Sequence, residues 1–452
     1  MDMTSGPILP KVLLFSGPLM LTGVLQLLYN AADIVVVGQF AGAQALAAVG
    51  STASLINLRV NVFMGLSVGA SVLVARQWGA RQDQEVSTAV HTSITIALIS
   101  GVTVGLLGVT AARPLLEMMG SPEDVIDGAT LYVRIFFLGM PFNMLYNFGA
   151  AILRATGDTR RPLYYLTIAG VINVGLNLLL VIVFRMSVAG VAIATVASQA
   201  VSSVLILLCL MHSSGPLHLD LHNLRIQGSQ LKEIIRIGLP AGLQGSLFSI
   251  SNVLIQSSVN SFGSIAMAGN AASGNLEGFV YTAMNSIYQA DLTFSSQNYG
   301  AHKPQRVNQV MYWCLGTVAA IGLGLGMLVV SLRVPLLSLY NSDPEVIAWG
   351  ARRLTVIVPT YCLCGMMDTM VGQLRGIGCS VLPMIVSLAG ACAFRIVWIL
   401  TLFQIPEFHT LEVLVWSYPA SWALTFLVHL ICYYAVRGRH LAAITEKAPV
   451  DS

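Results

Sequence analysis

Charged residues are scarce in this sequence. Asp, Glu, Lys and Arg make up 10% of the 452 residues, whereas they make up about 25% of an ordinary soluble domain. Hydrophobic residues make up 56%, and the mean hydropathy is +0.76. Apolar runs of about 20 or more residues, long enough to cross a hydrocarbon core, recur along the chain. The composition therefore excludes a water-soluble fold and indicates a polytopic membrane protein.

The sequence also lacks the patterns of several other classes. The seven cysteines lie in apolar runs or at their ends, which favours free thiols that pack as small hydrophobic side chains. Cys362 and Cys364 lack the second Cys/His pair of a zinc site, so no metal and no cofactor is expected. The net charge of +3 is spread over loops, which excludes nucleic acid as a partner. Met1–Pro10 has no cationic n-region, so we expect no cleaved signal peptide.

Apolar runs that end at charged residues, glycines and prolines predict an all-α fold with twelve transmembrane helices. The longest polar connection, residues 213–231, predicts a cytoplasmic linker between an N-lobe, residues 1–212, and a C-lobe, residues 232–437. Residues 438–452 are expected to form a cytoplasmic tail. The predicted spans are 13–37, 45–76, 86–111, 124–153, 162–184, 188–212, 232–259, 266–295, 307–332, 345–375, 382–404 and 411–437.

The cations predict the orientation. With both termini inside, 15 of the 23 Lys and Arg residues are cytoplasmic and five are outside, which fits the excess of cations in cytoplasmic loops. Those outside are Arg113, Arg185, Arg333, Arg352 and Arg353, and the remaining three, Arg59, Arg134 and Arg395, lie within spans.

Several motifs occur twice, about 221 residues apart. Six duplicated spans keep their direction, so they predict two parallel six-helix lobes related by an axis along the membrane normal. Such an architecture is typical of transporters that alternate access between the two sides. The matched pairs are Arg76–Ala80 with Gln297–Ala301, Arg113–Leu116 with Val334–Leu337, Leu153–Arg154 with Leu374–Arg375, Gly157 with Gly378, and Pro18 with Pro240.

Four segments resemble motifs of the multidrug and toxic compound extrusion (MATE) family. They are YNAADIVVVGQ (Tyr29–Gln39), LRATGDTRRP (Leu153–Pro162), AGVAIAT (Ala189–Thr195) and LRGIGCSVLP (Leu374–Pro383). The resemblance covers essentially the whole chain, and Ser273–Gln289 looks closest to Firmicutes-type bacterial members. It implies two six-helix bundles in a V in the bacterial inner membrane. It also implies a non-enzymatic, monomeric antiporter, coupled to H⁺ or Na⁺, that exports amphipathic, often cationic organic compounds.

Asp33 is an ionisable residue within the first predicted span, where an unpaired charge is costly and so suggests a function. Gln26, Tyr29 and Asn30 lie on neighbouring helical turns and form one polar stripe with it. Asp33 is interpreted as the group that binds the coupling proton, and a hydrogen-bonded structural acid is the alternative.

The resemblance adds three residues to this N-lobe site. Asn173 and Asn177, four residues apart, and Thr195 match the positions at which the family places the remaining groups of its cation site. One branch of the family has an Asp where this chain has Asn177. With one carboxylate left, the site favours a proton over Na⁺.

The C-lobe departs from the family pattern, because Phe248 stands where one branch has a Glu and Cys364 stands near the position of its Asp. Glu277 and Asp368 are predicted to form a different C-lobe site, or each to pair with Arg395 as a buried salt bridge. Both interpretations are kept.

Aromatic and methionine side chains are expected to line a substrate cleft, because adaptable apolar surfaces suit promiscuous binding. Ordinary helix packing is the alternative for each one. The candidates are Tyr29, Phe63, Met64, Tyr146, Tyr281, Met284, Tyr288 and Tyr361. The rival function is a flippase or exporter of lipid-linked or other metabolites, although few cations lie within spans to bind a polyanionic head group. An intramembrane enzyme is disfavoured because no cluster of catalytic residue types occurs.

Overall fold

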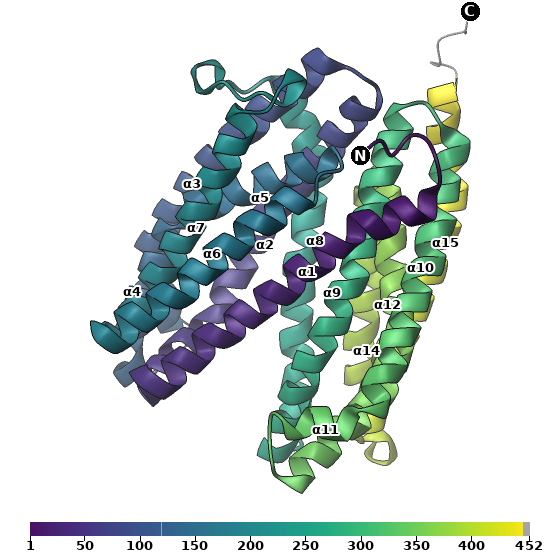
Figure 1. Ribbon diagram of the computed structural model, residues 1–452. Helices are drawn as coiled ribbons and strands as arrows, with labels where there is room; N and C mark the ends of the chain where they lie inside the picture. Colours follow the sequence, from purple (N-terminus) through teal and green to yellow (C-terminus); the bar gives the residue numbers. More distant parts are fainter. Residues whose placement is uncertain (119, 446–452) are drawn as a thin grey trace, which may run out of the picture. The chain divides into compact units, whose positions relative to one another are not determined.

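The computed structural model describes residues 1–118 and 120–445, and all regular structure in that part of the chain is helical (Figure 1). Some side chains within the helices fall outside this description, namely those of residues 43, 46, 50, 51, 53–60 and 443–445, which include Arg59. The part of the predicted tail beyond Thr445 falls outside it as well.

The described residues contain twelve helical segments that are long enough to cross a membrane. Eight of them are long and apolar enough to cross a membrane, and a bent pair, α4 and α5, makes a ninth. The other three, α2, α8 and α9, are long enough to cross a membrane as well. This agrees with the twelve spans predicted from the sequence.

The first six segments are α1 (Ile8–Val36) with the π-helical turn η1 (Val37–Ala41), α2 (Ala43–Gly79), α3 (Asp83–Met118), the pair α4 (Glu123–Leu138) and α5 (Met140–Ala155), α6 (Arg160–Asn177) with η2 (Leu178–Val183), and α7 (Ser187–Met211). The last six are α8 (Gly228–Asn260), α9 (Ser264–Gly300), α10 (Pro304–Ser331), α12 (Pro344–Gly376), α13 (Val381–Ser387) with η5 (Leu388–Ala393) and α14 (Phe394–Leu400), and α15 (Leu411–Thr445). Short helices lie in the connections: η3 (Gly215–Leu217), η4 (Leu221–Asn223), α11 (Arg333–Ser338), η6 (Leu402–Gln404) and η7 (Pro406–Phe408).

The fourth predicted span, 124–153, is not one straight helix. It breaks at Gly139 into α4 and α5, which meet at an angle of 46°. Pro141 stands in the first turn of α5, where its missing N–H donor costs nothing but cannot continue the hydrogen bonds of α4.

Backbone conformation repeats along with the sequence motifs. Three pairs of residues 221 positions apart have nearly the same positive φ, a conformation that most side chains rarely adopt. The hydrogen bonds repeat too, since the amides of Gly157 and Gly378 each donate to a carbonyl three residues earlier at 2.9 Å. The duplication therefore extends to loop geometry. The pairs are Gly42 (90°) with Gly263 (94°), Arg81 (55°) with His302 (56°), and Gly157 (92°) with Gly378 (90°).

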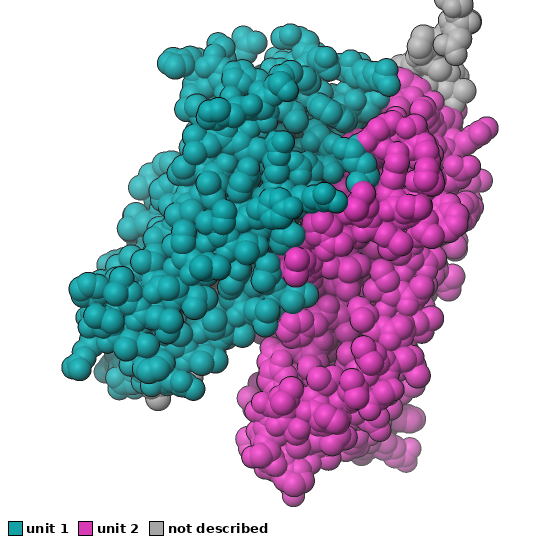
Figure 2. All heavy atoms as spheres, in the orientation of Figure 1, with its two compact units in different colours: residues 1, 24–242 teal, residues 2–23, 243–452 magenta. Residues whose placement is uncertain are grey.

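The chain divides into two compact units, which Figure 2 colours separately. Unit 1 comprises residues 1 and 24–242, and unit 2 comprises residues 2–23 and 243–452. The chain changes unit within α1, after Gly23, and again within α8, after Gly242. The lobes predicted above instead follow the order of the spans, and their boundaries stay a prediction.

In unit 1 the first half of α8 packs closely on α2 through small residues. A β-carbon added to Gly65 would overlap the backbone of Gly242, and one added to Gly238 would lie 2.6 Å from the Cα atom of Leu66. Only glycine allows two helix backbones to approach in this way.

In unit 2 the segment before α1 is held at the loop between α9 and α10. Met3 is fully buried, and its carbonyl accepts hydrogen bonds from Asn298 at 3.1 Å and Arg306 at 3.2 Å. Lys303 donates to the carbonyl of Thr4 at 2.7 Å. These contacts fix the segment that precedes the first span.

Candidate functional site

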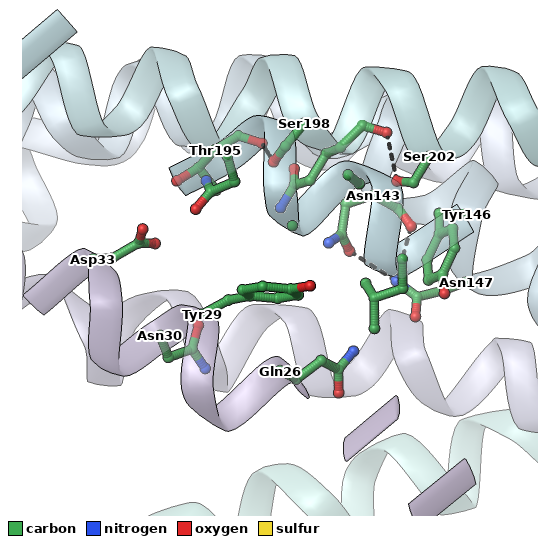
Figure 3. Close-up of a pocket in the computed structure, with 15 residues that line it drawn as sticks. Gln26, Tyr29, Asn30, Asp33, Asn143, Tyr146, Asn147, Thr195, Ser198 and Ser202 are labelled. Atoms are coloured by element: carbon green, nitrogen blue, oxygen red, sulfur yellow. Dashed lines mark hydrogen bonds between the residues drawn. The ribbon is translucent and has the colours of Figure 1, made fainter. Parts of the chain in front are cut away.

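Four helices of unit 1 enclose a polar cavity of about 260 Å³ (Figure 3). Helices α1, α5, α6 and α7 line it mostly with amide and hydroxyl side chains. Asp33 is the one ionisable carboxylate in this lining, and no Lys, Arg or His from the described residues joins it. The cavity can therefore hold a positive charge more readily than a negative one.

The cavity exists because polar stripes on separate helices meet. On α1 the stripe runs through Gln26, Tyr29, Asn30 and Asp33, whose spacing of three to four residues places them on one face. Figure 3 shows Asp33 near Thr195 at one end of the cavity, with Asn147 and Ser202 toward the other. Similar stripes come from Asn143 and Asn147 on α5 and from Thr195, Ser198, Gln199 and Ser202 on α7, and α6 adds Asn173.

Asp33 forms its hydrogen bond with the end of α6. The side-chain amide of Asn177 donates to Oδ1 of Asp33 and also lies 3.2 Å from Oδ1 of Asn173. Asn177 is fully buried and Asn173 is 5% exposed. The structure thus brings together the predicted group of Asp33, Asn173 and Asn177, while Asn30 and Thr195 line the same cavity.

Two buried oxygens at the cavity have no hydrogen-bond partner among the described residues. They are Oδ1 of Asn177 and Oε1 of Gln199. Thr195 does not satisfy them, because its hydroxyl donates to the carbonyl of Val191 at 3.0 Å. Buried acceptors are normally paired. Of these two residues, Asn177 is the one whose amide is bonded to Asp33.

Five polar lining residues were not predicted from the sequence: Asn143, Asn147, Ser198, Gln199 and Ser202. Each lies three or four residues from another polar residue on the same helix. The same search for polar stripes that found Asp33 would have found α5 and α7.

The predicted substrate residues separate into three groups. Tyr29 and Tyr146 line the cavity, and their hydroxyls donate to the carbonyls of Thr167 at 3.4 Å and Pro162 at 3.0 Å. Phe63 and Met64 of α2 are half-buried and do not line it. The remaining four, Tyr281, Met284, Tyr288 and Tyr361, belong to unit 2.

Two of those four are part of the core of unit 2. Met284 is 1% exposed and packs against Gly322 and Gly365. Tyr288 is 8% exposed, and its hydroxyl accepts a hydrogen bond from Arg375 at 2.8 Å. Helix packing, the alternative interpretation, describes both. Tyr281 is 39% exposed and lies beside the half-buried Tyr361.

Glu277 pairs with Arg353, and the predicted pairing with Arg395 is wrong. Nε and Nη2 of Arg353 donate to the two carboxylate oxygens of Glu277 at 2.7 and 2.9 Å. Arg353 was predicted to lie outside, near the start of the predicted span 345–375. In the structure α12 begins at Pro344, so Arg353 lies inside the helix and is 9% exposed. Asp368 forms no salt bridge with Arg395 among the described residues, where Arg395 donates from Nε to the hydroxyl of Ser421.

Twelve helical segments of span length among the described residues, a duplicated architecture and a polar cavity with one carboxylate are typical of a polytopic membrane transporter. A family model, MatE, matches the chain twice, over residues 18–179 and 240–401. The chain belongs to this family. The two matched stretches begin and end 222 residues apart, which confirms the internal repeat.

Curated relatives span nearly the whole chain. A Bacillus subtilis protein named probable multidrug resistance protein YoeA is 29% identical over 424 residues, which cover 92% of this chain and 91% of that protein. A Shewanella oneidensis protein named FAD transporter is 27% identical over 349 residues, covering 75% and 76%. Among solved structures, a Pyrococcus furiosus transporter of the MOP superfamily matches with a TM-score of 0.90 at 20% identity over 98% of both chains. These relatives confirm the prediction of a MATE-type transporter.

Proposed function

We propose that the protein is a proton-coupled antiporter that exports amphipathic, often cationic organic compounds by alternating access. One observation carries the proposal: Asp33 is a lone carboxylate in a cavity lined by uncharged polar groups. The name of the Bacillus relative, a probable multidrug resistance protein, supports export of such compounds. Export of a metabolite is the second candidate, because the Shewanella relative is named a FAD transporter.

Exchange follows if a proton and a cationic compound compete for Asp33. The ionised carboxylate attracts the compound, and protonation removes that attraction. The amide of Asn177 stabilises the ionised form by its hydrogen bond to Oδ1. After protonation the hydroxyl of Asp33 becomes a donor for an acceptor such as the unpaired Oδ1 of Asn177, reached by rotation of the amide. Two ligands that exclude each other in this way are thermodynamically coupled.

A proton fits this site better than Na⁺ does. Hard cations prefer several oxygen ligands, usually with carboxylates among them, and Asn177 replaces a second carboxylate. We further propose that both termini and residues 213–231 are cytoplasmic, because this orientation places 15 cations on that side and four on the other, with Arg353 buried in α12.

The proposal is tested in liposomes that contain the purified chain and a fluorescent organic cation such as ethidium. A pH gradient or a Na⁺ gradient is imposed alone. We expect the pH gradient to drive ethidium movement and Asp33→Asn to abolish it, since Asn cannot exchange a proton. The control is Asp127→Asn, which removes an exposed acid of unit 1 and is expected to leave transport unchanged. Transport by Asp33→Asn at the wild-type rate, or transport driven by Na⁺ alone, would contradict the proposal.

A further inference from the structure

Residues 213–231, the linker between α7 and α8, lie against α3 within unit 1. Leu219 of the linker is 1% exposed, and its amide donates to the carbonyl of Leu210 in the last turn of α7 at 3.1 Å. Thr92 of α3 holds the later part of the linker, because its hydroxyl accepts a hydrogen bond from the amide of Gln227 at 3.3 Å. The linker is therefore folded onto the unit along most of its length.

A buried histidine of α3 makes a second contact with the linker. Nε2 of His91, which is 8% exposed, accepts a hydrogen bond from the amide of Asp220 at 3.1 Å. Nδ1 of the same ring lies 2.7 Å from the carbonyl oxygen of Ser87. A carbonyl can only accept and a backbone amide can only donate, so Nδ1 carries a proton and Nε2 presents its lone pair. The two contacts together require the neutral ring in one tautomer.

A proton on Nε2 of His91 removes the acceptor that the linker uses. Both ring nitrogens of a charged imidazole are donors, so the N–H of Nε2 then faces the N–H of Asp220 with no acceptor between them. Ser87 keeps its bond in either form, because Nδ1 is a donor in both. Histidine is the side chain that ordinarily changes its charge between pH 5 and 8. Mild acidification therefore breaks this one contact of the linker.

The carboxylate of Asp220 is used within the linker itself. It accepts hydrogen bonds from the amide of His222 at 3.0 Å and from the side-chain amide of Asn223 at 2.6 Å. The bond from the His222 amide lowers the pKa of the Asp220 carboxyl, so this group stays ionised where histidines titrate. No salt bridge joins it to His91 in the described part of the chain. The carboxylate therefore does not replace the lost bond.

Other ionisable groups surround His91, but the hydrogen bonds of its ring among the described residues are those to Ser87 and Asp220. The groups at this end of α3 and on the elements packed against it are Asp83 and Glu85 of α3, Arg76 of α2, Arg81 of the turn between them, Arg154 of α5, and His218, His222 and Arg225 of the linker. The contact with the linker thus depends on the protonation of His91 itself.

We propose that His91 is a pH-sensitive switch that holds the linker on α3. When the ring is neutral, the segment around Asp220 is docked. When the ring is charged, that segment detaches, while Thr92 still holds Gln227. Acidification of the solution around the linker thus lengthens the free connection between α7 and α8. This regulation goes beyond the proposed export function and does not rest on it, because docking requires neither a substrate nor an ion gradient.

The test is hydrogen exchange of the purified full-length chain at about pH 7.5 and about pH 5.5, on either side of the usual histidine range. Mass spectrometry with fragmentation resolves single amides, and each rate is divided by that of an unstructured peptide at the same pH. We expect the amide of Asp220 to lose protection at least about 5-fold in acid, the effect of one hydrogen bond. The amide of Gln227 is the internal reference and is expected to keep its protection, because Thr92 does not titrate. Equal protection of Asp220 at both pH values, or an equal loss at Gln227, would overturn the proposal.

Two variants of His91 separate the switch from a general effect of acid. His91→Gln keeps an acceptor for the amide of Asp220 in its side-chain carbonyl but cannot become charged, so Asp220 is expected to stay protected at both pH values. His91→Phe keeps a ring without an acceptor and is expected to leave Asp220 unprotected at both. Retained protection of Gln227 shows that each variant is folded. A pH response of wild-type size in His91→Gln would contradict the proposal.

Two further histidines of unit 1 provide controls. His222 is the rival source of a pH response, because its Nδ1 lies 3.3 Å from the carboxylate of Asp220 and its side chain is 97% exposed. His212 is exposed just after α7, with Nδ1 2.8 Å from the carbonyl of Leu208. His222→Gln and His212→Gln are both expected to keep the pH response at Asp220. Loss of that response in His222→Gln, together with its survival in His91→Gln, would place the switch within the linker and refute the role of His91.

Discussion

Glu277 and Arg353 neutralise each other inside unit 2. Their side chains are 8% and 10% exposed, and both carboxylate oxygens are used. The residue next to Arg353 makes the opposite kind of pair, since Arg352 bonds to Glu412 with both partners about half exposed. Adjacent arginines therefore provide an internal comparison of a buried and an exposed ion pair.

Glu277→Gln is expected to lower the free energy of unfolding by about 3–5 kcal/mol, because it leaves the charge of Arg353 buried without compensation. Glu412→Gln is expected to cost about 0–1 kcal/mol, since exposed pairs contribute little. Thermal unfolding of the two variants in detergent makes the comparison. Equal destabilisation would show that burial does not determine the strength of the Glu277 pair.

At the scale of residues, the sequence predicted groups that lie on one helix and missed those that depend on a partner from another. Asp33 and Asn30 share a helical face, which their spacing shows, whereas Asn173 and Asn177 were assigned to the same site by the family resemblance. Arg353 gave no such signal. Its partner Glu277 is 76 positions away on α9, and a charged pair read locally suggests the end of a span.

Glycines allow the backbones of α2 and α8 to pack directly against each other. Gly65 and Gly69 of α2 face Gly238 and Gly242 of α8 within unit 1, and a β-carbon at Gly69 would overlap the carbonyl of Ile234. Without side chains between them, the backbones are in contact. Such an approach of two helix axes depends on small residues at the contact.

Gly65→Ala is expected to destabilise the protein by about 1–3 kcal/mol or more, because the added methyl group has no space beside a rigid backbone. Gly175→Ala is the matched control on α6, where a β-carbon meets nothing within 4 Å. The control is expected to be neutral or slightly stabilising, since Ala favours helix by about 1 kcal/mol over Gly. Size-exclusion chromatography after heating measures the fraction that remains folded. An unaffected Gly65→Ala variant would mean that α2 and α8 are not in close contact.

The elements themselves were predicted well from apolar runs, apart from the break at Gly139. Hydropathy sums over a window and cannot detect a change of direction. Pro141 marks a position where a helix can break. A proline in the first turn of a new helix and a proline that kinks one continuous helix look alike in sequence, however, so the break could not be predicted.

At the scale of the whole chain, the duplication was readable because it preserves turn residues at a fixed distance. Gly157 and Gly378 mark equivalent turns with φ of 92° and 90°. The division into compact units was not readable, because it falls inside two continuous helices. No change in composition accompanies Gly23 or Gly242.

Met3→Ala is expected to lower the stability of unit 2 by about 2–5 kcal/mol, since it empties a fully buried site. Five of the six tryptophans, all except Trp78, belong to unit 2, so tryptophan fluorescence follows its unfolding. Met118→Ala, which truncates a side chain that is 83% exposed, is expected to change stability by less than about 0.5 kcal/mol. Equal unfolding midpoints for the two variants would mean that the N-terminal segment is not part of unit 2.

The assignment of residues 2–23 to unit 2 also affects how the chain is made. These residues leave the ribosome first, yet the rest of unit 2 begins at Leu243 and is synthesised last. During translation the first half of α1 must wait in the bilayer while more than 200 residues are added, with its packing partners still missing. Unit 1 can fold early, whereas unit 2 can fold completely only after the last helix is inserted. Truncated chains released before α15 would then carry an unsatisfied first helix, a feature by which membrane quality control could recognise them.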